Sequence, residues 1–440
     1  GSDTLADLSC TTDQIAKWDG AAWVCAADVD TDTDSDTLAS LSCSTDQIAK
    51  WNGSAWVCDS TLEDRVEALE TLLASVSLEN GGEEFIFTSV NVHVRDGSGD
   101  TDGTVNGLGN LIVGYNEDTS TGGTATRTGS HNLVLGAENE YTSYGGFVGG
   151  TLNTISGAYS SVSGGLDNTA SGNSSSVSGG SGNTASGTYS SVSGGWGNTA
   201  SSDSSSVSGG WDNTASGTYS SVSGGNSNTA SEWYSSVSGG SWNTASGGYS
   251  SVSGGRYNAA SGGYSSVSGG EDNTASGFYS SVSGGEDNTA SGDWSSVLGG
   301  GGSAAGDGNE AWAHYSVIGG GRVNTAGDDS GTDRTVGEAS VVLAGSSNRA
   351  EEDLAAVSGG YENRASGIYS SVSGGSYNTA SEWYSSVSGG QLNTASGDYS
   401  SVSGGLENTA SGENSTIGGG ANGSVSGGAD WLAGTLFEDN

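Results

Sequence analysis

A valine recurs every fifteen residues over most of this chain and sets its pattern of apolar and polar positions. The spacing is unbroken from Val162 to Val297, slips twice, and then resumes from Val357 to Ile417. Around each valine the chain reads Ser-Ser-Val-Ser-Gly-Gly-x-x-Asn-Thr-Ala-Ser-Gly-x-Tyr. A period this short predicts stacked units, none of which can bury a core alone.

Each repeat offers two short strands, one centred on the valine and one on the alanine eight residues later, as in Val162 and Ala170. The inward residues are then Val and Ala, and Gly-Gly and Ser-Gly pairs form the corners. The pattern predicts an all-β, parallel β-solenoid over residues 147–428. Insertions near 298–316 and 318–341 should bulge outward without breaking the stack.

Two polar columns accompany this core. The asparagine before Thr-Ala, such as Asn168, recurs at one corner, where stacked side chains would bond to one another and to the turn backbone. A tyrosine three residues before most valines, such as Tyr159, should point away from the valine and form a ladder at about 4.8 Å per coil. We favour structural stacking for this ladder over glycan binding.

Residues 83–146 predict a β-rich transition that caps the solenoid, because terminal repeats are atypical. Strand patterns occur at 85–87 and 90–94, and degenerate early coils at 110–114, 131–136 and 146–150.

Residues 60–80 predict a short helix with a coiled-coil seam. The apolar spacing alternates between four and three, and 65–70 (Arg-Val-Glu-Ala-Leu-Glu) resembles the trimerisation signature of parallel three-stranded coiled coils. Gly81-Gly82 should end the helix. The residues expected to hold the trimer are Leu62, Arg65, Val66, Leu69, Glu70, Leu73 and Val76.

Residues 1–27 and 37–59 are copies of one module. Each carries two Trp, two Cys and an Asp-Gly or Asn-Gly turn, which predicts a β-hairpin. We favour the disulfides Cys10–Cys25 and Cys43–Cys58, and four cysteines leave two other intrachain connectivities open. Stapled mini-domains are typical of an extracellular, oxidising setting.

The linker at 28–36 alternates Asp with small residues, which is typical of a solvated, self-repelling segment. Calcium binding by several converging chains is the alternative. No cofactor is otherwise expected.

Composition excludes several classes of function. With a net charge of −41 and only 10 Lys and Arg, neither nucleic acid nor an anionic membrane is an expected partner. No apolar run is long enough for a transmembrane helix. Disorder is the alternative for a chain this rich in Gly and Ser, but the strict register favours an ordered stack. A chain without Met is expected to be a processed product or an excised fragment.

No catalytic motif occurs, so we do not expect an enzyme. The insertions hold the irregular polar side chains, and they favour decorative or receptor-binding loops over a glycosidase pair. These side chains are Asp307, Glu310, His314, Asp328, Asp329, Asp333, Arg334 and Glu338.

The segments 161–165 (Ser-Val-Ser-Gly-Gly) and 170–172 (Ala-Ser-Gly) resemble the head repeats of trimeric autotransporter adhesins, over roughly residues 130–428. The resemblance implies a left-handed β-roll in each chain and three rolls about one axis. The order of hairpins, coiled coil and roll is also similar to that of phage tail fibres. Residues 431–440 do not match the membrane anchor of the adhesins, so self-anchoring is not expected.

We therefore expect an extracellular homotrimeric fibre of the adhesin or tail-fibre kind that binds a surface glycan or protein receptor. The alternative is a subunit that polymerises end to end through the hairpins and a tail at 429–440. A glycan-degrading fibre ranks third. The apolar residues expected at the two ends are Trp18, Trp23, Trp51, Trp56, Trp431, Leu432, Leu436 and Phe437.

Overall fold

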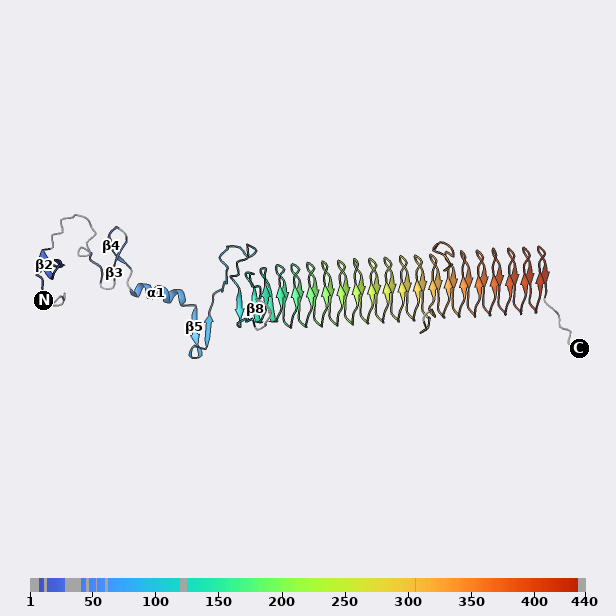
Figure 1. Cartoon of the computed structure of the whole chain (residues 1–440), viewed down its shortest axis with the longest axis horizontal. Coiled ribbons are helices and arrows are strands. Elements are labelled where there is room, and N and C mark those ends of the chain that lie inside the picture. The colour runs from blue at the N-terminus through green and yellow to red at the C-terminus, as the bar shows by residue number, and fades with distance from the viewer. Residues whose placement is uncertain are drawn as a thin grey trace. The chain divides into compact units, whose positions relative to one another are not determined.

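The chain forms two compact units, Gly1–His93 and Val94–Asn440. The structure is a computed structural model that describes residues 8–11, 14–27, 41–44, 47–52, 54–59, 62–118, 125–304 and 306–433. In its described part the second unit is a parallel β-solenoid of about 20 turns, seen as the row of coils in Figure 1. The predicted fold of the repeat region is confirmed.

One side of the solenoid is a parallel sheet that we call the valine sheet. It begins with β7 (Leu111–Val113), β8 (Leu133–Ala137) and β10 (Phe147–Thr151). It continues with β12 (Ser161–Val162), which recurs every fifteen residues as the even-numbered strands to β30 (Ser296–Val297). Its last part comprises β32 (Val317–Ile318), β34 (Val341–Val342), β36 (Ala356–Val357), the even-numbered strands to β44 (Thr416–Ile417), and β46 (Trp431–Leu432).

The opposite side is the alanine sheet. It begins with β9 (Glu140–Tyr141), β11 (Thr154–Ile155) and β13 (Thr169–Ala170), and the last recurs every fifteen residues to β29 (Thr289–Ala290). It then comprises β31 (Glu310–Ala311), β33 (Thr325–Ala326), β35 (Arg349–Ala350), β37 (Arg364–Ala365), the odd-numbered strands to β43 (Thr409–Ala410), and β45 (Ser424–Val425). Equivalent residues pair in register, as Ala170 does with Ala185.

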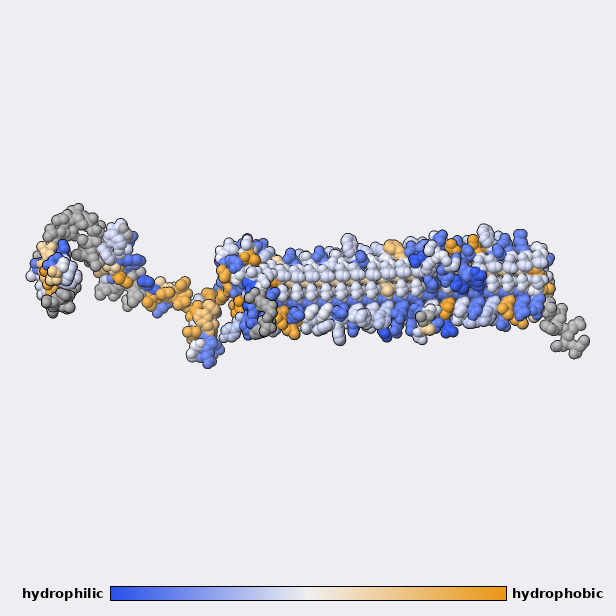
Figure 2. All heavy atoms as spheres, in the orientation of Figure 1, coloured by the Kyte–Doolittle hydropathy of each residue, from blue (hydrophilic) through white to orange (hydrophobic). Residues whose placement is uncertain are grey.

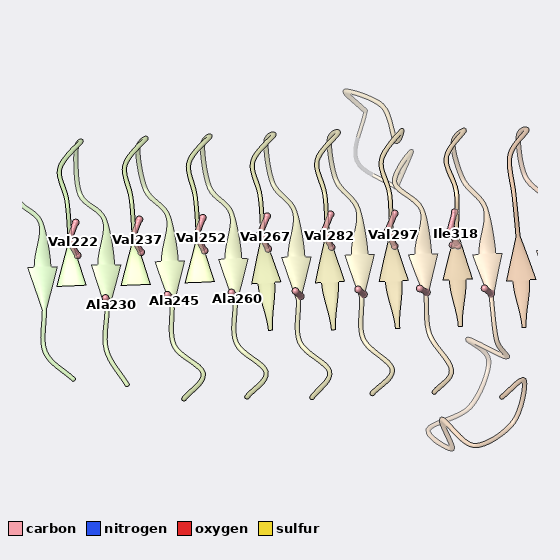
Figure 3. Close-up of a cluster of buried hydrophobic side chains, with 14 of the residues drawn as sticks. Val222, Ala230, Val237, Ala245, Val252, Ala260, Val267, Val282, Val297 and Ile318 are labelled. Carbon is pink, nitrogen blue, oxygen red and sulfur yellow. The ribbon is translucent and has the colours of Figure 1, made fainter. Parts of the chain in front are cut away.

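The core is a file of valine side chains against a file of alanine side chains (Figure 3). Val162, Val177, Ala170 and Ala185 are all completely buried. Such a narrow core explains how a chain with only 5 Phe and no Met can fold. Each coil buries little apolar surface, so its stability depends on the coils above and below it.

A third column of backbone contacts runs between the two sheets. Isolated parallel bridges join Leu166 to Ser181, Ser181 to Trp196 and Trp196 to Trp211, and they continue along the stack. The sequence predicted only two strands per coil. This third contact uses backbone atoms only, so the residues that form it vary freely from repeat to repeat. The sequence therefore carries no pattern that would predict it.

The asparagine column is a continuous hydrogen-bonded ladder, as predicted. The backbone N–H of Asn183 donates to Oδ1 of Asn168 at 3.0 Å, and Asn183 Nδ2 donates to the carbonyl oxygens of Gly179 and Gly195. The ladder ends at Gly423, whose N–H donates to Asn408. Each buried amide therefore satisfies its own groups and the corner of the next coil.

The two insertions leave the stack intact, which confirms the prediction. They are the loops between β30 and β31 and between β33 and β34, seen at the top and bottom of Figure 3. Strand β30 still pairs with β32, and β32 with β34. Both loops are shorter than predicted, because residues 310–316 and 318–326 complete regular coils.

The solenoid extends beyond its predicted limits at both ends. It starts at β7 rather than at 147, because the degenerate coils already pair in parallel. At the other end Trp431 pairs with Thr416, and Leu432 packs against the core. The assignment of 429–433 to a separate tail was wrong. Leu436 and Phe437 lie outside the described residues.

The first unit contains the two predicted hairpins. Strands β1 (Gln14–Trp18) and β2 (Trp23–Ala27) pair antiparallel, as do β3 (Ile48–Trp51) and β4 (Trp56–Asp59). At the first turn, Oδ1 of Asp19 accepts hydrogen bonds from the backbone N–H groups of Ala21 and Ala22 at 2.8 Å. These two hydrogen bonds lower the pKa of Asp19, and the bond from Ala22 has the larger effect.

The helix of this unit, α1 (Leu62–Leu73), is shorter than the predicted span of 60–80. Val76 was predicted to be a seam residue, but it lies in β5 (Val76–Glu79), which pairs antiparallel with β6 (Glu84–Phe87). The 3₁₀ turn η3 (Asn80–Gly82) joins the two strands. Gly81 and Gly82 therefore turn a hairpin rather than end the helix. The predicted strand at 90–94 is also wrong, since no neighbouring strand pairs with it in the described chain.

Candidate functional site

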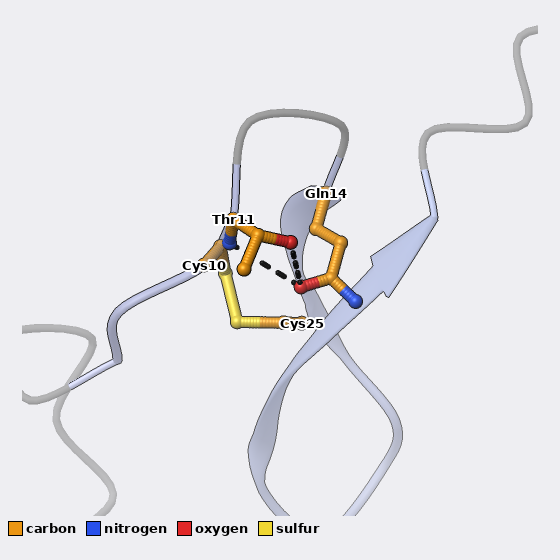
Figure 4. The surroundings of a disulfide bond; sticks show 4 residues. All are labelled: Cys10, Thr11, Gln14 and Cys25. Carbon is orange, nitrogen blue, oxygen red and sulfur yellow. Dashed lines mark hydrogen bonds between the residues drawn. A yellow bond between two sulfur atoms is a disulfide. The ribbon is translucent and has the colours of Figure 1, made fainter.

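The hairpins carry paired tryptophans beside a disulfide. Cys10 and Cys25 are bonded with a Cα separation of 5.3 Å, which confirms the favoured pairing (Figure 4). The second hairpin repeats it with Cys43 and Cys58, whose Cα atoms are 5.4 Å apart. No described cysteine is free.

The tryptophan rings stand edge to face across each hairpin. The ring centroids of Trp18 and Trp23 are 5.8 Å apart, as are those of Trp51 and Trp56. Trp18 remains 45% exposed and Trp51 43%, because a two-stranded module is too small to cover them. Each hairpin thus leaves aromatic surface exposed.

Helix α1 exposes the apolar residues of its predicted seam. Val66, Leu69 and Leu73 are about half exposed, and Arg65 and Glu70 are exposed beside them. The side chain of Leu62 lies outside the described residues. A helix of 12 residues is marginal alone in water, and no other described element covers this apolar face.

Tyrosine rings form two ladders along one row of turns. Neighbouring rings are stacked, with centroids 4.7–5.8 Å apart in the first ladder and 4.7 and 5.1 Å apart in the second. The first comprises Tyr219, Tyr234, Tyr249, Tyr264, Tyr279, Trp294 and Tyr315, and the second Tyr369, Tyr384 and Tyr399.

The ladder was predicted, but its reason was wrong. These tyrosines lie in turns rather than on strands, and Tyr249 and Tyr264 have φ of +60° and +58°. Each ring inside a ladder, apart from the two terminal rings, has a stacked neighbour on both faces. Only ring edges then meet solvent, so a sugar has no free aromatic face to stack on along the ladder.

The second insertion folds back over the outer face of the alanine sheet. Nη1 of Arg334 donates to the carbonyl oxygen of Ser291 at 2.6 Å, and the guanidinium lies 4.9 Å from the Trp312 ring centroid. The N–H of His314 donates to the carbonyl oxygen of Arg334 at 3.0 Å. These contacts fasten the loop across two coils.

An ion-pair network secures the same loop farther along the sheet. Arg349 pairs with Asp329 and with Glu351, and Glu351 also pairs with Arg364 at 2.6 Å. Arg349 and Arg364 occupy positions that hold Thr in the regular repeat. Their departure from the repeat was the available sequence signal, and the prediction overlooked it.

Glu310 is one of several carboxyls of this region that have a shifted pKa. Burial raises its pKa, and the neighbouring carboxylate of Asp329 adds to the rise. Two neighbouring carboxyls, one of which has a raised pKa, are typical of glycosidases. Asp329, however, is held by Arg349, so the arrangement is suited to holding the loop rather than to activating a water molecule.

Two shallow cavities flank the loop, of about 450 and about 240 Å³. The first is lined by Trp312, His314, Thr332, Asp333, Arg334 and Thr335. The second is lined by Gly306, Gly308, Glu310, Val323, Thr325, Asp329, Ser347 and Arg349.

The polar residues predicted for the insertions fall into separate groups. His314, Asp333 and Arg334 line the first cavity, and Glu310 and Asp329 line the second. Asp307 lies 4.0 Å from Arg322 in the first loop. Asp328 bonds to Ser330, and the N–H of Glu338 donates to Asp353 at 3.0 Å. These residues therefore do not gather at one site, although Gly306 and Gly308 of the first loop and Asp329 of the second line the same cavity.

Among the described residues no group of three or more His, Cys, Asp and Glu side chains is placed to hold a metal ion. The Asp-rich linker proposed for calcium lies outside those residues. The histidines do not form a cluster: His131 contacts Asp96 and His314 contacts Asp293. His93 belongs to the other compact unit.

Comparison with known proteins does not assign the chain to a family. No protein-family model matches the chain, and no curated protein matches it significantly. Within the described residues, no helix has both the length and the apolar character needed to cross a bilayer. The disulfides indicate a compartment outside the reducing cytoplasm.

Proposed function

We propose that this chain is a non-enzymatic structural protein that assembles as a parallel homotrimer into an extracellular adhesive fibre, with a surface glycan or protein as its receptor. The observation that carries the proposal is the seam of α1. Val66, Leu69 and Leu73 are 44%, 54% and 53% exposed in the single chain. Association of three helices would bury these side chains and stabilise a helix that is too short to persist alone.

The solenoid supports a mechanical task. Every coil pairs with the next through both sheets and the asparagine ladder, and insertions are carried on the turns without a break in the stack. Such a body holds surface loops at a distance from its attachment point. The fastened second insertion is our candidate for receptor contact, because a loop held in place on a rigid scaffold is suited to recognition.

The test is the oligomeric state of the full chain by sedimentation equilibrium. We expect three chains per particle for the native protein and single chains for Leu69→Glu, because the new charge falls in the seam. Thr71→Glu is the matched control, since it adds the same charge on an exposed, non-seam position and should remain trimeric. A native protein that sediments as a monomer at micromolar concentration would remove the proposal.

End-to-end polymerisation is the second candidate, and one observation favours it. Among the described residues no strand pairs with β46 on the side away from β44, and Trp431 in β46 is 70% exposed where regular coils hold Ser. Open edges and apolar surface at one end are suited to longitudinal contact. Trp431→Ser restores the repeat residue. If electron microscopy shows filaments that this variant loses while its trimers persist, polymerisation is supported; filaments in both proteins would exclude Trp431 as the contact.

A further inference from the structure

The outer face of the valine sheet is uncharged along the whole described solenoid. Its outward positions are the residues that flank each buried valine, such as Ser161 and Ser163 around Val162. From β7 to β46 none of these positions holds Asp, Glu, Lys, Arg or His. The full chain has a net charge of −41, so charge has been confined to the other surfaces.

Apolar side chains replace serine on this face at three levels of the stack. Leu111 and Val113 are 51% and 56% exposed at its start, and Leu298 and Leu343 are 58% and 53% exposed beside the insertions. Trp431 is 70% exposed in the last coil. Exposed apolar residues on an otherwise small and flat surface indicate a contact that removes them from water.

The other surfaces carry charged residues at some levels of the stack. The alanine sheet carries Glu310, Arg349 and Arg364 at outward positions, and the second insertion lies across it through Arg334. The bridge column between the sheets carries charged residues, Arg256, Glu271 and Glu286 among them. Figure 2 shows one flank of the solenoid, where a strongly hydrophilic patch interrupts the rows of small residues.

We infer that copies of this chain pack side by side through the outer face of the valine sheet. The number of copies is that of the proposed trimer, on which this inference rests. The new point is the surface through which the copies touch. Two chains of charge −41 repel, and at physiological ionic strength the repulsion is screened only beyond about 8 Å. A charge-free face is the surface through which they can approach to sheet-packing distance, about 10 Å.

The occupant of this face is another copy rather than an unrelated partner, because the apolar levels repeat identically in every chain. In parallel copies in register, Leu111 meets Leu111 and Leu343 meets Leu343, while serine rows meet between them. A parallel coiled coil at α1 would set that register. Equivalent levels of the three chains then meet around one symmetry axis that runs parallel to the stack.

The test compares two single-cysteine variants within one coil. Ser268 lies on the outer face of the valine sheet and Ser261 on that of the alanine sheet, and both are exposed in the single chain. All four native cysteines are in disulfides, so each variant has one reactive thiol. The labelling rate of Ser268→Cys and Ser261→Cys by a bulky maleimide is measured on the full chain under non-reducing conditions.

We expect Ser268→Cys to react about tenfold more slowly than Ser261→Cys, the factor that a packing free energy of 1.4 kcal/mol produces. Protection should vanish in the Leu69→Glu background. Equal rates in a protein that sediments as a trimer would overturn the inference and leave the proposed function intact. Protection of Ser261→Cys instead would assign packing to the alanine sheet. A monomer by sedimentation would overturn both.

Discussion

Tyr249 and Tyr264 stack face to face, with ring centroids 4.8 Å apart and planes inclined by 2°, although both residues have a left-handed backbone. Stacking of the two rings stabilises this arrangement, whereas the left-handed backbone conformation destabilises it. A side chain at positive φ costs about 1–2 kcal/mol in an L-residue. The N–H of Tyr249 compensates in part by donating to the carbonyl oxygen of Trp233 at 2.7 Å.

Replacement of Tyr249 therefore separates strain from stacking. Tyr249→Ala and Tyr249→Gly both lose the two ring contacts, but only glycine relieves the backbone. We expect the glycine variant to be more stable than the alanine variant by roughly 1 kcal/mol. Hydrogen exchange of neighbouring amides measures the difference, since a stack of repeats need not unfold in one step. At Ser174, where φ is +54° and no ring is present, Ser174→Gly should show the strain relief alone. An alanine variant as stable as glycine would contradict the strain argument.

Two adjacent glycines at one corner should differ sharply in their tolerance of a methyl group. A Cβ on Gly240 would lie 2.1 Å from the carbonyl oxygen of Gly255, and its φ is +87°. A Cβ on Gly239 meets nothing within 4 Å. We expect Gly240→Ala to cost about 3 kcal/mol or more in local stability and Gly239→Ala less than about 1. Hydrogen exchange across this corner in both variants is the measurement, and equal costs would show that the corner relaxes.

The asparagine ladder predicts a large local cost at Asn243. Its Nδ2 donates to the carbonyl oxygens of Gly239 and Gly255, and its Oδ1 accepts from the N–H of Asn258. Asn243→Ala leaves these buried groups unsatisfied, so we expect a loss of roughly 3 kcal/mol or more around this coil. Asn226→Ala, on an exposed residue one coil earlier, is the control and should change little. Amide exchange that rises equally in both variants would argue against the ladder as a source of stability.

Reduction of the disulfides should act on the hairpins alone. Each closes a separation of 15 residues, for which about 3 kcal/mol of stabilisation is expected. The repeats contain no cysteine. Amide exchange in 14–27 and 48–59 should accelerate under reducing conditions, while that of the solenoid stays unchanged. Loss of protection in the solenoid would mean that its folding depends on the hairpins.

Glu310 predicts a pH-dependent stability of the coil that contains β31. Because burial raises its pKa, the folded protein binds this proton more tightly than the unfolded chain does. Its contribution to stability is therefore full below the ordinary Glu pKa and is lost as pH rises through the raised value. Glu310→Gln should stabilise the β31 coil at neutral pH, and this gain should shrink toward acid. The exposed Glu382→Gln should show no such trend in local hydrogen exchange. A gain that grew toward acid would reverse the sign of the argument.

Much of the fold could be predicted because the same pattern of residues occurs in almost every coil. Val162 and Ala170 sit at constant offsets, and parallel stacking places each beside its own equivalent, so a local pattern is sufficient to find the core. The hairpin disulfides followed from duplication in the same way. The end of α1 was missed because the apolar spacing of 62–76 fits a helix, while the pairing of Val76 with Phe87 gives β5 a partner strand.

The sequence by itself determined the period, the inward residues and the asparagine ladder, since each depends on contacts between copies of one motif. It only favoured the disulfide pairs, through the duplication of the hairpin. Only the tertiary structure decided which departures from that motif meet. Arg334 reaches the carbonyl oxygen of Ser291 and the ring of Trp312, and Arg349 reaches Asp329, across separations with no fixed period. The uncharged outer face of the valine sheet likewise emerges only when the coils are stacked. The physical reason is that contacts between repeats follow from the spacing of residues along the chain. Contacts made by an inserted loop depend instead on how the loop folds back over the completed sheet.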